Sequence, residues 1–360
     1  MTPRPLGWRR LLSTAVLLGA ATVLLVALFA RAGSETLGHD FRAYFVATEA
    51  IRNGESPYPS PESPIVDEGR AYVYPPLLAL ALLPLTTVSV DVGAAVGFLL
   101  ALAALLGALA VVGVRDIRCY AAMLASAPVW NALEMANFSA AIALGVALAW
   151  RLRSTVWPLA LTVGIAVSSK LFVWPLVVWT AATGRYRASL LAAIVGVLVT
   201  ALSWAAIGFD GLTAYPALLD RLSDALAGDS YSFIGVAGAL GADPVAGRLA
   251  MFVVGGILIA ACVRLARAGD DRQAFTCALA AALALSPIVW QHHLVVLFVP
   301  LALARPQFSA WWLLPTVLWL GPRATHPDGL EPFLAPLVVA GILYVSLARP
   351  REIATPVQAT

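Results

Sequence analysis

Long apolar stretches alternate with short polar breaks along most of this chain. Apolar runs of about 20 residues are long enough to cross a bilayer as helices. The alternation predicts helices near 11–30, 90–114, 119–135, 138–150, 155–168, 171–183, 188–207, 248–266, 273–287, 291–304, 308–320 and 333–348. We therefore expect an all-α polytopic membrane protein of about 12 spans. Several spans are short, which predicts tilted or broken helices around a cavity.

Two longer polar segments, 31–89 and 208–247, interrupt this pattern within what we expect to be one integral membrane domain over 1–360. In the first, one side of a helix expected at 41–53 carries Phe41, Tyr44, Phe45, Thr48 and Ile51, which predicts an amphipathic helix lying on the membrane. The tandem prolines at 75 and 76 predict the start of a short re-entrant or interfacial helix. The second segment is rich in turns, and it either closes over a substrate or is a passive surface loop.

Charge and composition agree with a membrane protein and give it an orientation. The chain is 61% hydrophobic and only 12% charged, which excludes an ordinary soluble globule. If both termini face the cytoplasm, fifteen of the 23 basic residues lie on the inner side and sixteen of the 20 acidic residues on the outer side. Since inner loops of membrane proteins carry excess positive charge, both long polar segments are predicted to face outward.

The N-terminus has a second interpretation. Arginines precede the apolar run at 11–30, and Ala30-Arg31-Ala32 resembles a signal-peptidase site. The run is longer than a usual signal core, so we expect a retained first span. A net charge of +3 without a basic tract argues against nucleic acid as a partner. The isolated cysteines are expected to be free structural thiols: Cys119, Cys262 and Cys277.

Asp40 is the most informative residue, because it is an acid in a polar segment held between apolar runs. One interpretation is that it caps the helix expected at 41–53. The other is that its carboxylate accepts a proton from a reacting group.

The order of several motifs resembles the glycosyltransferase 87 family, whose members are membrane enzymes of the GT-C class. The likeness is carried by Asp40 with Tyr44, a Gly-x-x-Pro-Tyr turn at Gly54 to Tyr58, a Tyr-Pro-Pro segment at Tyr74 to Leu85, Lys170 at a helix end, and Ser-Pro-x-x-Trp-x-His-His at Ser286 to His293. The family includes actinobacterial polyprenol-phosphate-mannose-dependent α-mannosyltransferases. The resemblance implies a GT-C-like fold, inversion at the anomeric carbon, and substrate contacts from Tyr44, Tyr58 and Tyr74. Leu171 and Asn137-Phe138 depart from the usual pattern, which leaves the acceptor open.

The remaining candidate residues fit the chemistry of a lipid-phosphate sugar donor. Lys170 is the only lysine, and it either snorkels to the interface or contacts the donor phosphate. His292 and His293 point about 100° apart on a helix, so sequence does not rank them as phosphate ligands, and both are alternatively an interfacial polar pair. Glu134 and Asn137, and likewise Asn131, are expected to bind sugar hydroxyls, although Glu134 is equally well explained as a solvated side chain.

We therefore expect an inverting transferase with Asp40 as general base, moving mannose or a related sugar from a polyprenyl-phosphate donor to a glycolipid or glycan acceptor. No metal-ligand spacing is present, so no cofactor or metal is expected. The expected location is the plasma membrane of an actinobacterium, with the active site on the outer face and no obligate protein partner. The alternative is a secondary transporter or permease, whose charged residues would lie near the bilayer midplane.

Overall fold

The computed structural model describes residues 7–30, 37–320 and 331–348, and this part of the chain is helical without strands. The helices, with 3₁₀ helices written η, are α1 (Trp8–Phe29), α2 (His39–Arg52), α3 (Pro64–Asp67), α4 (Leu77–Ala81), η1 (Leu83–Thr87), α5 (Val90–Val111), α6 (Ile117–Leu124), α7 (Ala127–Glu134), α8 (Ser139–Arg151), α9 (Val156–Ser169), η2 (Leu171–Val173), α10 (Pro175–Ala182), α11 (Tyr186–Ala206), α12 (Tyr215–Leu226), α13 (Phe233–Ala239), α14 (Pro244–Arg267), α15 (Asp271–Ala284), η3 (Gln291–Leu297), α16 (Phe298–Ala304), η4 (Ala310–Leu320) and α17 (Glu331–Leu347).

Four of the described helices, α1, α5, α11 and α14, are long and apolar enough to cross a membrane. Shorter apolar helices of 10–17 residues accompany them. An all-α polytopic membrane protein is therefore confirmed, while about twelve spans stays a prediction. The three cysteines are buried free thiols, as expected.

Three of the short predicted spans are broken, as their length led us to expect. Residues 119–135 form two short helices, α6 and α7, and 171–183 begins as the 3₁₀ turn η2 before α10. Residues 291–304 likewise divide into η3 and α16. Proline explains two of these breaks, because Pro128 and Pro175 lie in the first turns of α7 and α10, where the missing N–H is tolerated.

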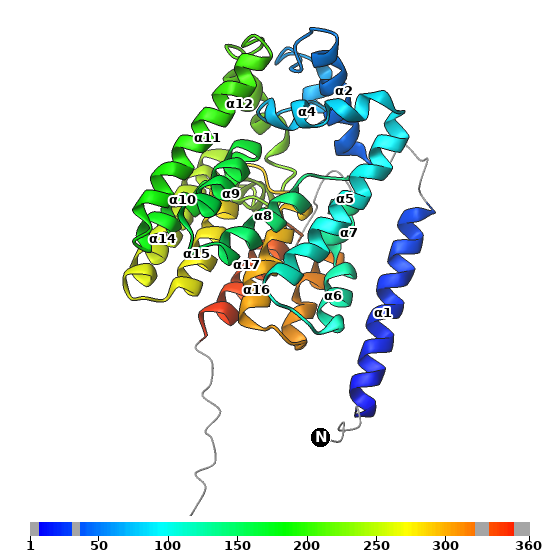
Figure 1. The fold of residues 1–360 in the computed structure, drawn as a ribbon, viewed down its shortest axis with the longest axis vertical. Coiled ribbons are helices and arrows are strands. Elements are labelled where there is room, and N and C mark those ends of the chain that lie inside the picture. Colours follow the sequence, from blue (N-terminus) through cyan, green and yellow to red (C-terminus); the bar gives the residue numbers. More distant parts are fainter. Residues whose placement is uncertain (1–6, 31–36, 321–330, 349–360) are drawn as a thin grey trace, which may run out of the picture.

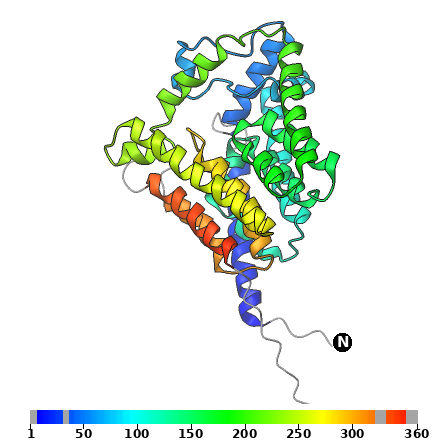
Figure 2. The same cartoon turned by 90° about the vertical axis from the view of Figure 1, so that its left-hand side faces the viewer.

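Part of each polar segment lies at one end of the molecule (Figure 1), which we call the α2 end. α2, α4 and α12 lie there, whereas α1 begins and α17 ends at the opposite end (Figures 1 and 2). Turns bearing arginine meet at this opposite, arginine-rich end. Asp271, the first residue of α15, pairs with Arg185 at 2.6 Å and Arg153 at 3.4 Å, which joins the α8–α9 and α10–α11 connections to the start of α15.

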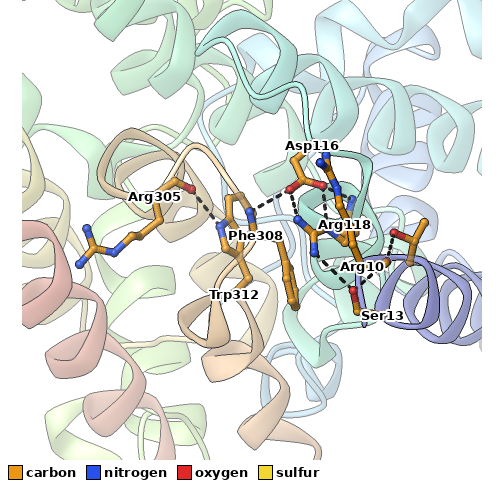
Figure 3. A network of polar contacts seen from close by, with 8 residues as sticks. Arg10, Ser13, Asp116, Arg118, Arg305, Phe308 and Trp312 are labelled. Carbon is orange, nitrogen blue, oxygen red and sulfur yellow. Dashed lines mark hydrogen bonds and ion pairs between the residues drawn. The ribbon is translucent and has the colours of Figure 1, made fainter. Parts of the chain in front are cut away.

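A second network at the arginine-rich end holds the connections after α5 and α16 together (Figure 3). Arg118 pairs with Asp116 at 2.7 Å and donates to Ser13 Oγ of α1 at 3.3 Å. Asp116 also accepts from the backbone N–H of Phe308 at 3.2 Å. Hydrogen bonding from Arg118 holds the pKa of Asp116 at about 2, so this carboxylate stays charged at neutral pH.

α2 has the predicted amphipathic character, but its apolar side packs on protein rather than facing lipid. Phe41, Tyr44 and Thr48 are buried among the neighbouring elements α4, α5 and η1. Gly93 and Gly97 of α5 provide the space for Phe41, since a Cβ on either glycine would lie 2.9 Å from its ring. The Gly-x-x-x-Gly pattern is therefore a close-packing site that holds the start of α2.

Filling this space should disturb α2. We expect Gly97→Ala to lower thermal stability by about 1–3 kcal/mol through overpacking against Phe41. Gly107→Ala on the same helix is the matched control, because its Cβ would meet only Leu144 Cδ1 at an ordinary 3.5 Å. Thermal unfolding of both purified variants measures the difference. Equal melting temperatures would contradict the packing role of Gly97.

The second polar segment packs against the first. Tyr215 at the start of α12 donates to the carbonyl of Val73 at 2.8 Å, and Arg221 pairs with Asp67 at 2.6 Å. Trp204 of α11 stacks on Tyr58 with ring centroids 5.0 Å apart. α12 therefore covers the first polar segment, and closure over a substrate stays a prediction.

Candidate active site

Four segments far apart in sequence meet beneath the α2 end: the first turn of α2, the turn between α7 and α8, the end of α9, and η3. Asp40 lies in the first turn of α2, whose N-cap is Gly38, and no side-chain cap bond closes this helix. The capping interpretation of Asp40 is therefore wrong. Its carboxylate instead accepts from Asn137 Nδ2 at 2.5 Å.

Asn137 lies at the centre of the arrangement and is only 1% exposed. Its Nδ2 donates to Asp40 and to the hydroxyl of Tyr44, the latter at 3.0 Å. Its Oδ1 accepts from the backbone N–H of Ser139 at 2.7 Å and from Lys170 Nζ at 3.1 Å. These four contacts use both hydrogens and both lone pairs of the amide. A sugar contact from Asn137 stays a prediction, and it requires one of these bonds to open.

The backbone before Asn137 is strained. Ala136 has a φ of 46°, in the left-handed region that side chains other than glycine rarely adopt. This conformation turns the chain between the end of α7 and the start of α8. Strain of this kind is common at functional sites, and here it directs Asn137 toward α2.

Lys170 ends α9 in an extended conformation and is 2% exposed. Its Nζ donates to Ser139 Oγ at 2.8 Å as well as to Asn137, and it lies 3.4 Å from His293 Nε2. The ammonium also lies 4.9 Å from the centre of the Tyr74 ring. A snorkelling lysine would reach the surface, so that interpretation is wrong.

His293 faces Lys170, with its ring proton placed by the backbone. The N–H of Trp290 donates to His293 Nδ1 at 2.9 Å. A neutral imidazole with Nδ1 accepting carries its proton on Nε2. Nε2–H and the Lys170 ammonium are then two donors 3.4 Å apart, an arrangement suited to one anionic oxygen between them.

His292 has a different environment. Both its backbone N–H, at 3.2 Å, and its Nδ1, at 2.9 Å, contact Asn131 Oδ1. Because this oxygen only accepts, Nδ1 carries the proton and Nε2 has a free lone pair. Nε2 is buried and has no hydrogen-bond partner among the described residues. The structure thus separates two histidines that sequence could not rank.

Tyr44 and Tyr74 border the polar centre, with ring centroids 5.5 Å apart. Tyr58 lies farther away, and its hydroxyl donates to the backbone carbonyl of Tyr74 at 2.8 Å. Its substrate role stays a prediction, since this bond and the stacking on Trp204 already explain the side chain. Glu134 is 8% exposed and accepts from Trp130 Nε1 at 2.9 Å, so the solvated interpretation is wrong.

The environment of Asp40 favours a proton acceptor. Burial raises the pKa of Asp40 above the ordinary value of 3.8, against the opposing effects of the Asn137 bond and the charges of His39 and Lys170. A raised pKa makes the carboxylate a stronger base than an exposed aspartate.

The structure adds Ser139 to the site as the nearest partner of Lys170, and it shows that Asn131 orients His292. The sequence did contain a signal for Ser139, because Asn-Phe-Ser allows the asparagine side chain to bond the backbone two residues on. Within the described residues, no three His, Cys, Asp or Glu side chains gather as a metal site would require. Chemistry without a metal stays a prediction.

Comparison with known proteins places this chain in a family. The model of glycosyltransferase family 87 matches residues 72–289, more than half of the chain. The match includes Tyr74, Asn137 and Lys170, while Asp40 precedes it and the histidine pair follows it. Comparison with curated proteins and with solved structures gave no match. The chain belongs to glycosyltransferase family 87 and is a glycosyltransferase.

Proposed function

We propose that this glycosyltransferase moves mannose or a related sugar from a polyprenyl-phosphate donor to a glycolipid or glycan acceptor. The observation that carries the proposal is the continuous series of polar contacts from Asp40 through Asn137 to Lys170 and His293. It provides a base at one side and two anion-binding donors at the other. Transfer of a sugar from a lipid phosphate to a hydroxyl group needs both the base and the anion-binding donors.

The reaction follows as a direct displacement. Asp40 accepts the proton of the acceptor hydroxyl while that oxygen bonds to the anomeric carbon. The bond from this carbon to the phosphate oxygen breaks, and the phosphate leaves with the electron pair. Lys170 and His293 Nε2–H stabilise the charge on the leaving oxygen. A single displacement inverts the anomeric centre, so a β-linked donor yields an α-linked product.

An apolar cavity beside the histidines supports a lipid donor. It has a volume of about 230 Å³ and lies among α13, α14, α15 and α17, with Leu283, Val289 and Leu294 in its wall. Tyr231, also in the wall, accepts from Gln291 next to His292 at 2.9 Å. An isoprenoid chain in this cavity would start close to the phosphate donors.

The charge pattern supports an orientation for this reaction. Arginines gather at the end opposite Asp40, and positive residues favour the cytoplasmic side. We infer that the α2 end faces outward, that both termini are cytoplasmic, and that transfer occurs at the outer face of the plasma membrane.

Narrowing the apolar cavity should impair use of the lipid donor. Ala340 lines it and is exposed, so Ala340→Phe would fill space without overpacking the core. We expect KM for the lipid donor to rise about 10-fold, a change of about 1.4 kcal/mol in binding. Leu337→Phe is the control on the same helix, since Leu337 is exposed outside the cavity. An unchanged KM for Ala340→Phe would place the lipid chain elsewhere.

Sugar transfer tests the function directly. Membranes containing the protein are supplied with radiolabelled polyprenyl-phosphate-mannose and EDTA, and labelled glycolipid is measured. Transfer that membranes lacking the protein do not show would support the donor and metal-free chemistry. Transfer that is lost only when EDTA is present would reject metal-free chemistry. Absence of transfer, with flux of the labelled lipid across the membrane, would favour the permease alternative.

A further inference from the structure

A basic cavity at the arginine-rich end lies outside the site described above. It has a volume of about 350 Å³ and opens between the α8–α9 and α10–α11 connections. Arg153, Arg185 and Arg187 line it together with Ser154 and Thr155. Three guanidinium groups around one cavity indicate an anionic ligand.

The charges of this cavity are not balanced by the protein. Asp271 is shared by Arg153 and Arg185, so one acid serves two arginines. Arg187 is exposed and forms no ion pair within the part of the chain that the structure describes. Stacking fixes the two paired guanidiniums, with Arg153 4.0 Å from the Trp150 ring and Arg185 5.3 Å from the Trp179 ring.

Two helix starts add to the positive potential. α9 and α11 both begin at the cavity, and neither has a side-chain cap bond. Their first-turn N–H groups therefore carry the positive end of each helix dipole. The arginines and these N–H groups act on the same space.

The surroundings are those of a membrane interface. Tyr186 is 72% exposed in the cavity wall and Trp157 is 60% exposed at the start of α9. Aromatic residues favour the headgroup level of a bilayer. Beyond them, α11 exposes apolar side chains, including Leu190 and Val197, along a helix long enough to span the membrane.

We propose that this cavity binds the phosphate of an anionic phospholipid, with the acyl chains along the exposed apolar surface of α11. The unpaired arginine and the paired arginines supply the charge, and the aromatic rim sets the depth. Basic recesses between membrane helices are suited to such headgroups. The site lies at the opposite end from Asp40 and is distinct from the sugar-donor site.

Binding is tested on the purified full-length protein in neutral detergent by native mass spectrometry. Short-chain phosphatidylglycerol, short-chain phosphatidylcholine and inorganic phosphate are titrated separately, without any sugar donor. We expect phosphatidylglycerol to bind more tightly than phosphatidylcholine. Arg187→Gln should weaken its binding about 5-fold, the effect of one arginine near a lipid surface. Ser154→Glu, at an exposed position, should weaken it at least as much.

Arg115→Gln is the matched control, since Arg115 is exposed at the same end but outside the cavity. Loss of binding in both cavity variants and not in the control would support the proposal. Equal binding of the two lipids, or wild-type binding by both variants, would overturn it. Displacement of phosphatidylglycerol by millimolar phosphate would overturn the lipid assignment in favour of a soluble anion. Sugar transfer is not part of this measurement, so its outcome is independent of the proposed function.

Discussion

Asp40→Asn is expected to lower sugar transfer by about 10²- to 10⁴-fold, the range that general-base catalysis contributes. The amide has the size of the carboxylate but cannot take the proton of the acceptor hydroxyl. Initial rates with saturating lipid donor, at matched protein levels, measure the effect. Asp91→Asn is the control, because Asp91 also lies at the α2 end and forms an exposed pair with Arg42, which contributes little. Similar rates in both variants would exclude Asp40 as the base.

The pH dependence of wild-type transfer gives the same hypothesis a second readout. A general base works only when deprotonated, so activity is lost as pH falls through the pKa of Asp40. Burial raises this pKa, and the acidic limb of kcat/KM should therefore lie above 3.8. The residual activity of Asp40→Asn should lack this limb. A limb retained in the variant would belong to another group.

Lys170→Met is expected to lower kcat/KM by about 10²- to 10³-fold, as removal of a donor that stabilises a developing negative charge does. Methionine keeps much of the length of the side chain without its charge. The melting temperature should stay level or rise, because a buried charge costs free energy that an apolar group does not.

Measuring activity and thermal unfolding on the same preparation distinguishes a catalytic role of Lys170 from a structural role. Loss of both in parallel would mean that it is a structural residue. Arg248→Gln is a suitable control, since it removes an exposed cation paired with Asp224 at 2.8 Å. It should change neither quantity appreciably.

Local patterns predicted much of the fold. The 3.6-residue period correctly selected the buried side of α2, including Phe41, Tyr44 and Thr48. The same pattern did not reveal what covers that side. Apolar side chains face lipid or protein equally well, and the glycines of α5 that accept Phe41 lie about 50 residues away.

The site was predictable as a set of residue types rather than as a geometry. Lys170 was singled out as the only lysine, and its position at the end of α9 was correct. The difference between His292 and His293 depends on contacts made by η3. Trp290 orients the ring of His293, and Asn131 of α7 orients the ring of His292. These contacts join segments up to 161 residues apart, and the turn at Ala136 is a strained conformation that local preference opposes.

The position of Asn137 between Asp40 and Lys170 has a consequence for the electrostatics of catalysis. Opposite charges in a medium of low dielectric constant attract strongly, and direct contact would neutralise both. Asn137 separates the two charged groups. Its Nδ2 donates to the carboxylate of Asp40, its Oδ1 accepts from the ammonium of Lys170, and its side chain occupies the space between them. The carboxylate therefore keeps its basicity and the ammonium its affinity for anions. In the proposed mechanism, one neutral side chain thus keeps apart the two charges on which sugar transfer depends.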